Sequence, residues 1–306
     1  MTHLFIINPA AGSRDRTKQY SEIIHKICGQ RGLTYRIEVS SAPGECCRLA
    51  REAAQTGEPY RIYACGGDGT LNEVASGAAG YDNVAVTVLS GGSGNDFVKL
   101  FSEPKAFFDL ERLLDADEAA FDLIRCNDDI SLNICSVGLD ARIGTDVANY
   151  KRIPLLSGFR AYAVSTLVNV FRGISEHYVT EINGEVIDRE QTLICICNGR
   201  FYGGGFNPIK DANPADGQMN ILLTKNISRV KAASLIGAYG DGRYYEVPDL
   251  ITRVDANKIH VKLDKVSVIN IDGEAIYTDD LTVELIPGAV NFIVPEGMTY
   301  FDKKPE

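Results

Sequence analysis

A glycine-rich turn between a strand and a helix constrains the fold of this chain more than any other feature. Residues 62–65 form an apolar run typical of a buried strand, and the sequence GGDG at residues 66–69 interrupts it. A helix is expected next, with Thr70 as its cap and Asn72 in its first turn. Glycines let a backbone approach a phosphate closely, and the free amides at a helix start favour an anion. The stretch therefore predicts a phosphate-binding turn.

Asp68 is an unusual residue for such a turn, because a carboxylate repels a bare phosphate. It fits if a divalent cation bridges the two groups, or if it accepts hydrogen bonds from the turn's own amides. An ordinary strand-to-helix turn with a capping aspartate is the alternative. The stretch lacks the GxGxxG pattern of dinucleotide-binding folds and the GK[ST] pattern of P-loops, so the surrounding sequence has to decide.

Strands and helices alternate through the first hundred residues. Strands are predicted at residues 4–7, 35–39, 62–65 and 84–89, and helices at residues 17–29, 45–56 and about 70–77. This alternation predicts βαβ units and a parallel sheet covered on both faces. Glycine-rich loops follow three of the strands, and a serine-rich turn follows the strand at residues 35–39. Because ligands bind beyond the carboxyl ends of such strands, we expect all four loops on one edge, around a phosphate site.

From about residue 121, short strands separated by turns replace this pattern. The expected strands are residues 122–125, 131–137, 178–182, 191–197, 217–224, 258–262, 267–271, 281–286 and 291–294, interrupted by helical stretches at about 155–176 and 228–239. Asn183-Gly184 and Asp272-Gly273 are typical hairpin dipeptides. The sequence thus predicts an α/β domain with a parallel sheet over residues 1–122 and an all-β sandwich over 123–294, with residues 295–306 packing back on the first domain.

Composition argues against several classes of function. The net charge of −10 and a pI of about 5.0 argue against a nucleic-acid-binding protein. Four scattered histidines and eight scattered cysteines, without CxxC or HExxH, argue against a zinc enzyme. The longest apolar candidate for a membrane span, residues 161–171, is far shorter than the roughly 20 residues required. Free cysteines and the lack of a signal peptide favour a reducing, cytoplasmic compartment.

Five motifs together resemble the diacylglycerol kinase catalytic family, which includes the sphingosine and ceramide kinases. They are NPAAG at residues 8–12, GGDGTLNE at 66–73, SGGSGNDF at 90–97, NPADG at 213–217 and DGE at 272–274. Each motif is weak alone, but the five in order run along essentially the whole chain and most resemble the compact soluble bacterial members. The resemblance implies two domains, ATP in the cleft between them, and phosphoryl transfer to a lipid hydroxyl.

The resemblance also implies which residues line the nucleotide. They are Asn8, Pro9, Ala10, Ala11, Gly12, Ser40, Gly66, Gly67, Asp68, Gly69, Thr70, Leu71, Asn72, Ser93 and Asn95. Ser40 and Ser93 stand where the family usually has threonine, and both keep the hydroxyl group. The family commonly has GTxND where this chain has GSGND at residues 92–96, so this loop departs slightly from the pattern.

Carboxylates are the candidate ligands for magnesium, which prefers hard oxygen atoms. Asp68, Asp96 and Asp122 are the candidates for an active-site ion, although Asp122 could instead be a surface acid at a strand end. The NPADG loop resembles a structural magnesium loop of the family. The implied ligands there are Asp216 and backbone carbonyls near Asn213 and Gln218, and an ordinary turn is the alternative.

One of the two acids in the DGE motif is expected to accept the proton of the lipid hydroxyl. Phosphoryl transfer depends on positioning and charge neutralisation, and a carboxylate bonded to the hydroxyl supplies both orientation and a proton acceptor. Glu274 is favoured as this acceptor, with Asp272 as its neighbour or as a magnesium contact, and Asp68 completes the catalytic acids. The alternative is a simple hairpin turn.

Two segments suit a lipid substrate. Residues 201–206 place aromatic side chains around a flexible glycine hinge, and the apolar residues 155–171 have basic flanks, although core packing is favoured for the latter. We therefore expect an ATP- and magnesium-dependent lipid kinase, cytoplasmic and peripherally bound to membranes, acting on diacylglycerol or a related lipid. The alternatives are a kinase for a soluble substrate, as in NAD kinases, and a nucleotide-binding regulator without turnover. Strand edges of the β domain could also pair two copies into a homodimer.

Overall fold

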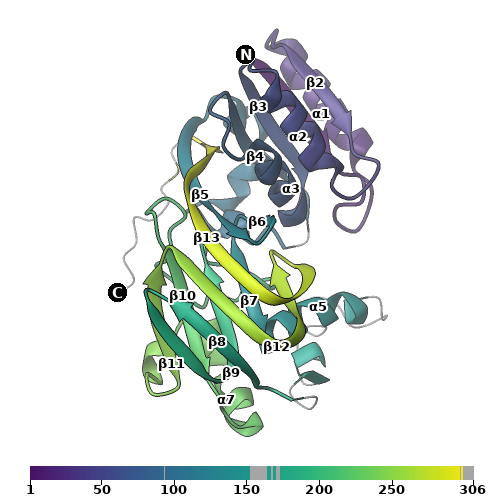
Figure 1. Cartoon of the computed structure of the whole chain (residues 1–306). Helices are drawn as coiled ribbons and strands as arrows, with labels where there is room; N and C mark the ends of the chain where they lie inside the picture. The colour runs from purple at the N-terminus through teal and green to yellow at the C-terminus, as the bar shows by residue number, and fades with distance from the viewer. Residues whose placement is uncertain (93, 152–163, 167, 170–172, 297, 299–306) are drawn as a thin grey trace. The chain divides into compact units, whose positions relative to one another are not determined.

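The computed structural model describes all residues except 93, 152–163, 167, 170–172, 297 and 299–306 (Figure 1). Most of the predicted helix at residues 155–176, most of the apolar stretch at 155–171, Ser93, and most of the 295–306 tail lie outside the described residues. The chain divides into two compact units. Unit 1 is Met1–Leu123 with the stretch that begins at Pro287, and unit 2 is Ile124–Ile286.

Unit 1 is built on a parallel sheet with helices between its strands (Figure 1). Its elements alternate as β1 (Thr2–Ile7), α1 (Thr17–Gln30), β2 (Tyr35–Val39), α2 (Glu45–Gln55), β3 (Tyr60–Gly66), α3 (Asp68–Ala78) and β4 (Val84–Ser90). The strands pair in parallel in the order β2-β1-β3-β4. All seven residues of β4 are buried, as expected for a parallel strand covered on both sides. The predicted βαβ arrangement is confirmed.

Aromatic packing completes unit 1. The chain continues through η1 (Phe97–Leu100), η2 (Pro104–Phe108), α4 (Leu110–Leu114) and the first part of β5 (Asp117–Cys126), and the end of β13 (Glu274–Val294) joins β4 in parallel. Phe121 and Phe292 stack at 5.1 Å between ring centroids, and Phe97 meets Phe292 edge-on at 5.3 Å. Phe97 directly follows the loop at residues 90–96, so this apolar cluster fixes the end of that loop.

The loops after the strands gather on one edge of this sheet. The amide of Asn8 donates to the carbonyl of Cys65 (3.1 Å), and the amide of Gly91 donates to that of Gly66 (2.7 Å). The amide of Ser40 donates to Ile7 (2.9 Å). The prediction of a shared edge is therefore confirmed by direct bonds between the loops.

The start of α3 differs from the prediction. The helix begins at Asp68, and its N-cap is Gly67 in an extended conformation, three residues before the predicted cap Thr70. The amide of Leu71 already donates to the carbonyl of Gly67 (3.0 Å), so Thr70 lies inside the first turn. An acid at the first helical position is favoured by the helix dipole, which explains why Asp68 opens the helix.

Unit 2 is strand-rich and antiparallel. Its strands are β6 (Asp129–Ser131), β7 (Ile134–Gly138), β8 (Glu176–Ile182), β9 (Glu185–Cys197), β10 (Met219–Lys225), β11 (Ile251–Ala256), β12 (Lys258–Ile271) and most of β13, with helices α5 (Leu139–Lys151) and α7 (Arg229–Gly240) and a turn η3 (Tyr244–Glu246). Strands β8 and β7 each pair with both β9 and β12, so these four strands close on themselves around an apolar core. The predicted all-β second domain with a sandwich-like core is confirmed.

Several boundaries in unit 2 differ from the prediction. The two hairpins are confirmed, with positive φ at Asn183 (52°) and Asp272 (50°) and at the glycine after each. The strand predicted at residues 131–137 is split into β6 and β7, because amides between them bond to Asp272. Predicted pairs of strands merge into β12 and β13, and α5 and β11 were not predicted. No helix of the described residues is long and apolar enough to cross a membrane.

Candidate active site

Asn8 ties the first loop to the glycine turn. Its side-chain amide donates to Oγ1 of Thr70 (3.1 Å), and its Oδ1 accepts from the amide of Ala10 (3.0 Å). The amide of Ala11 donates back to the carbonyl of Asn8 (3.1 Å), so the loop at residues 8–12 is a closed turn. Both ends of the Asn8 side chain are thus engaged within unit 1, and this residue positions the loop.

Glycines let the loops touch. Gly12 has φ +81°, and a Cβ there would lie 2.9 Å from the carbonyl oxygen of Gly91. A Cβ on Gly67 would lie 3.0 Å from the Cα of Gly92, and one on Gly91 would lie 1.9 Å from the hydroxyl of Tyr20. A Cβ at Gly12 would clash with backbone, and one at Gly67 would be tight against it. The loops therefore approach closely and leave a backbone-lined surface of the kind that accepts phosphate.

The other predicted nucleotide residues fall into two groups. Leu71 is buried (1% exposed) and packs into the core, and Ser40 is buried at the end of β2. Pro9, Gly69, Asn72 and Asn95 are exposed or half-buried at the loop edge. The structure thus brings residues 8–12, 40, 66–72 and 95 to one edge, with Leu71 turned into the core.

Asp68 and Asp96 form an acid pair on this edge. A Cβ added to Gly94 would lie 3.0 Å from Oδ2 of Asp68 and 3.5 Å from Oδ2 of Asp96, so both oxygens flank one backbone position. Oδ1 of Asp68 accepts from the amide of Phe97 (3.1 Å), and Oδ1 of Asp96 pairs with Nζ of Lys99 (2.5 Å). Burial raises the pKa of Asp68, and the charge of Asp96 adds to this, while the amides of Asp96 and Phe97 and the ammonium of Lys99 oppose it.

The acid pair fits a magnesium ion by its chemistry. Two carboxylate oxygens that repel each other are stabilised by a divalent cation, and hard oxygen ligands suit magnesium. Oδ1 of Asn95 and Oγ of Ser90 are also buried without a hydrogen-bond partner among the described residues. Such orphaned polar atoms are expected where a polar ligand completes the site. Within the part of the chain that the structure describes, no cluster of three or more His, Cys, Asp or Glu residues could hold a metal ion.

Asp122 has a different setting. Its Oδ1 accepts from the amide of Gly288 (2.7 Å), and the residue is 4% exposed. Asn291 pairs with Ala85, and the amide of Gly80 donates to Ala289 (2.8 Å), which sets Gly288 beside the start of β4. The glycine loops follow the ends of the strands, so this bond holds Asp122 toward the other end of the sheet. Its role as a magnesium ligand stays a prediction.

Glu73 and Lys99 are functional candidates that the sequence reasoning missed. The carboxylate of Glu73 accepts from the amides of Gly44 and Cys46, both at 3.1 Å, and so caps the start of α2 from α3. Lys99 neutralises one acid of the pair, as described above. The acidic end of the GGDGTLNE motif was a signal for the first. Nothing in the sequence alone indicated the second.

The two acids of the DGE motif have separate roles in unit 2. The carboxylate of Asp272 accepts from the amides of Leu132 (2.7 Å), Asn133 (3.2 Å) and Ile134 (2.8 Å). Burial raises its pKa to about 6, and these amides together with Ser131 oppose the rise. Glu274 is exposed at the start of β13. Asp272 is therefore a structural anchor of the hairpin, and Glu274 is the acid that faces solvent.

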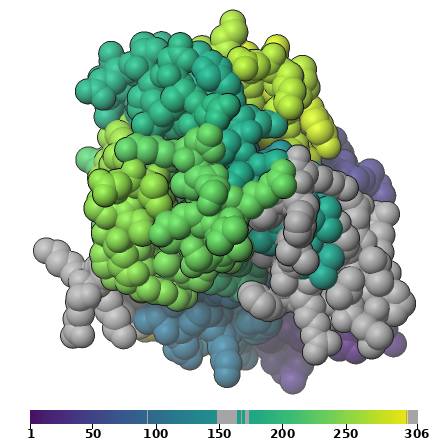
Figure 2. Space-filling view, turned by 90° about the horizontal axis from the view of Figure 1, so that it is seen from below, coloured from purple at the N-terminus to yellow at the C-terminus, as the bar shows by residue number. Residues whose placement is uncertain are grey.

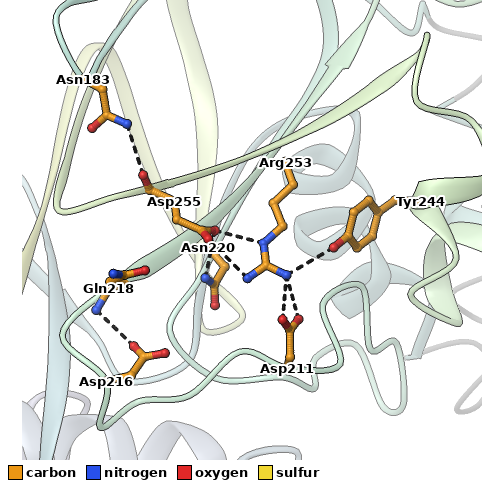
Figure 3. Close-up of polar contacts among 8 residues, drawn as sticks. All are labelled: Asn183, Asp211, Asp216, Gln218, Asn220, Tyr244, Arg253 and Asp255. Carbon is orange, nitrogen blue, oxygen red and sulfur yellow. Dashed lines mark hydrogen bonds and ion pairs between the residues drawn. The ribbon is translucent and has the colours of Figure 1, made fainter. Parts of the chain in front are cut away.

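The NPADG loop is a self-bonded turn in unit 2. The amide of Gln218 donates to Oδ1 of Asp216 (3.0 Å), as Figure 3 shows, and the amide of Asp216 donates to the carbonyl of Asn213 (3.3 Å). Nearby, Arg253 forms a bidentate ion pair with Asp211 (2.8 Å to each oxygen) and also bonds to Asp255 (Figure 3). One Asp216 oxygen and the Asn213 carbonyl are thus already used in the turn. The structural magnesium site stays a prediction.

An apolar cavity of about 60 Å³ lies in unit 2. Its walls come from α5, α7 and the strands beneath them, and include Leu139, Ile143, Phe206, Ala232, Leu235 and Tyr239. Figure 2 shows, in green, the surface formed by the part of the chain that contains α7. The glycines at 203–205 form a tight turn rather than an open hinge, because Tyr202 and Phe206 bond through their backbones (3.0 and 2.9 Å).

Known proteins share both parts of this architecture. Residues 2–126 match the model of the diacylglycerol kinase catalytic domain, and residues 133–294 match that of the YegS C-terminal NAD kinase beta sandwich-like domain. A Staphylococcus carnosus protein named "Putative lipid kinase" is 26% identical over 297 residues, covering 95% of each chain.

Solved structures agree on the fold. A "putative diacylglycerol kinase" from Bacillus anthracis is 23% identical with a TM-score of 0.74, covering 96% of this chain and 97% of its own. A second diacylglycerol kinase structure from that organism is 20% identical with a TM-score of 0.69 and the same coverage. At this level of identity the solved structures support only a shared fold. The two family models support membership of the family. The chain belongs to the diacylglycerol kinase catalytic family, with a YegS-type C-terminal domain.

Proposed function

We propose that this protein transfers the γ-phosphate of ATP to the hydroxyl of diacylglycerol or a closely related lipid, giving phosphatidic acid or the corresponding lipid phosphate. Membership of a kinase family supports ATP as the phosphate donor. The observation that carries the proposal is the acid pair Asp68 and Asp96, which flanks Gly94 among interlocked glycine loops. Those loops offer backbone amides to a polyphosphate, and the acids offer oxygen ligands to its magnesium.

The residues of unit 1 bind and orient the donor in this proposal. The amides of residues 67–69, at the start of α3, face the phosphates, because the amides of Asn8, Ala11 and Gly91 are bonded within the protein. Lys99 limits the negative charge of the acid pair. A bound magnesium ion would supply charge neutralisation for the transferring phosphoryl group. Asn8 and Glu73 contribute indirectly, because they hold the loops and the start of α2 in place.

Glu274 is the proposed proton acceptor. The lipid oxygen forms a bond to the γ-phosphorus, the bond from that phosphorus to the bridging oxygen breaks, and ADP leaves. The hydroxyl proton passes to the carboxylate of Glu274, which then releases it to water. Asp272 cannot take this role without giving up three backbone amides, whereas Glu274 is exposed.

The apolar cavity in unit 2 supports a lipid as the acceptor. Most of its lining residues are aliphatic or aromatic, and the polar ones are Asp140, Thr166, Thr192 and Thr224. A lining of this kind suits the end of an acyl chain better than a nucleotide. A lipid acceptor resides in a bilayer, so the reaction takes place at the bilayer surface. We therefore propose that the protein associates peripherally with membranes. A soluble acceptor in the manner of NAD kinases is the second candidate, favoured only by the sandwich-like C-terminal domain that the family model names.

An acceptor panel tests the proposal. Transfer of phosphate from radiolabelled ATP would be measured with diacylglycerol, sphingosine and ceramide in mixed micelles, with soluble NAD, and without acceptor. We expect magnesium-dependent labelling of a lipid, strongest for diacylglycerol. Labelling of NAD alone would replace the proposal by the soluble-acceptor function, and binding of ATP without labelling would replace it by a regulatory role.

The role of Glu274 has its own test. We expect Glu274→Gln to reduce kcat at least about 100-fold, because the proton acceptor is lost. The affinity for ATP and the melting temperature should stay unchanged, because the side chain is exposed. Asp279→Asn, another exposed acid on β13, is the matched control and should retain activity. Normal turnover in Glu274→Gln would remove this residue from the mechanism.

A further inference from the structure

Arg16 lies against the second glycine loop. Its Nη1 atom is 3.4 Å from the position that a Cβ on Gly91 would occupy, and the hydroxyl of Tyr20 lies between α1 and the same loop. Tyr20 donates to the carbonyl of Leu89 (3.2 Å), so α1 and the end of β4 are fixed relative to one another. This contact places the guanidinium on the edge of the sheet where the glycine loops meet.

Arg16 has no carboxylate partner in the part of the chain that the structure describes. Among the described residues no Asp or Glu forms an ion pair with Arg16, and its Nε atom is buried without a hydrogen-bond acceptor. Arg31, Arg61 and Arg253 pair with acids, whereas Arg189 shares with Arg16 a buried Nε atom that has no acceptor among the described residues. Arg16 differs from Arg189 in its position against Gly91. In a chain of net charge −10, an arginine left without an acid at a loop edge indicates an anion supplied from outside the chain.

Its neighbours point to the same ligand. The acid pair Asp68 and Asp96 flanks Gly94, and Arg16 flanks Gly91, three residues earlier in the same loop. A polyphosphate with one end at a metal held by the acids needs positive charge along the rest of its length. A guanidinium supplies this with a planar fork that matches two phosphate oxygens.

We propose that Arg16 binds the polyphosphate of the nucleotide through two hydrogen bonds. This inference rests on the proposed function only in taking ATP as the donor, and it adds a residue that none of the five motifs contains. The carbonyl of Leu89 holds Tyr20, and Tyr20 in turn keeps the guanidinium directed along the loop. Arg16 is therefore a binding residue whose contribution depends on the number of phosphates in the ligand.

Calorimetric titration with ATP and magnesium tests this. We expect Arg16→Met, which keeps the length of the side chain, to weaken ATP binding about 10- to 100-fold, and Arg16→Lys to lie between it and the unchanged protein. Arg14→Met is the matched control, because Arg14 lies two residues earlier and is exposed. This variant should bind ATP with unchanged affinity. Adenosine binding, followed by ligand-observed NMR, should be the same in all four proteins.

The outcomes separate the hypotheses. Equal losses for adenosine and ATP, or a lowered melting temperature that accounts for the loss, would overturn the inference in favour of a structural role. Unchanged ATP affinity in Arg16→Met would also overturn it. An unchanged protein that binds ATP but labels no lipid would overturn only the proposed function, whereas one that binds no ATP would overturn both.

Discussion

Individual residues at the candidate site divide into those that bind and those that hold other residues in place. Asn8, Glu73 and Asp272 carry polar groups that the motifs mark as functional, yet their hydrogen bonds are made within the protein. Asp68, Asp96 and Glu274 are the acids left to act on ligands. A motif match therefore identifies the neighbourhood of a site more reliably than it identifies the chemical role of each residue in it.

We expect the carboxylate of Asp68 to destabilise the folded protein when no metal ion is bound. Burial raises the pKa of Asp68, and the negative charge of Asp96 adds to this. At neutral pH the folded protein therefore contains an ionised carboxylate in surroundings that disfavour it, which lowers the free energy of unfolding. We expect Asp68→Asn to raise the melting temperature in EDTA and to reduce kcat at least about 100-fold. Thermal unfolding with and without magnesium checks this. The ion should stabilise the unchanged protein and not the variant, and an identical magnesium response would contradict a role in metal binding.

The raised pKa of Asp272 predicts that its contribution to stability decreases as the pH rises. Its pKa in the folded protein is about 6, above the ordinary value of 3.8, so folding favours the protonated form. Its contribution to stability is fully present below about pH 4 and is lost as the pH rises through about 6. Asp272→Asn lacks this titration but also loses an acceptor for backbone amides.

Urea unfolding of Asp272→Asn and the unchanged protein at several pH values between 4 and 7.5 measures this effect. We expect the stability advantage of the unchanged protein to shrink as the pH rises across that window. Asp279→Asn serves as the exposed control. A difference that does not vary with pH would show that Asp272 does not titrate in this range.

At the scale of elements, α2 and α3 act as one unit because Glu73 bonds to the first amides of α2. Removing an N-cap acceptor typically costs about 1 kcal/mol, and two amides lose their partner here. We expect Glu73→Ala to lower the free energy of unfolding by about 1–2 kcal/mol and to raise KM for ATP, because the turn that carries Ser40 precedes α2. Glu52→Ala, on the exposed side of α2, should change neither, and an unaffected KM in Glu73→Ala would limit this residue to stability.

The elements that the sequence predicted are those with a strong local signal. Continuous apolar runs and turn glycines sufficed for β1 to β4 and for α1 and α2. Strand β11 was missed because Thr252, Arg253 and Asp255 interrupt its apolar residues, and Arg253 is explained only by its distant partner Asp211. The split between β6 and β7 depends on Asp272, which is about 140 residues away in the chain. Contacts at such separations leave no local pattern.

The candidate site was predictable to the same extent. The acid pair and the glycine loops follow from motifs at strand ends, and the parallel sheet brings them together. Arg16 carries no such signal, because its position against Gly91 depends on where α1 begins and how it packs against β4. The division of roles between Asp272 and Glu274 also required the structure, since the two acids are neighbours in one motif.

At the scale of the whole molecule, the chain passes from unit 1 to unit 2 within β5 and returns within β13. Unit 1 is therefore assembled from two separate stretches of sequence, and its sheet includes residues near the C-terminus that pair with Ala85 and Val86. The fold class was predictable because each stretch has its own periodicity.

This return of the chain has a consequence for biosynthesis. While the ribosome is still adding residues 124–286, the N-terminal sheet has an open edge at β4, whose neighbour is not yet made. A nascent polypeptide in that state exposes unpaired backbone N–H and C=O groups of an apolar strand, which can pair with other chains. Unit 1 is thus expected to reach its final form only after residues 287–294 have been synthesised, and to rely on chaperones until then.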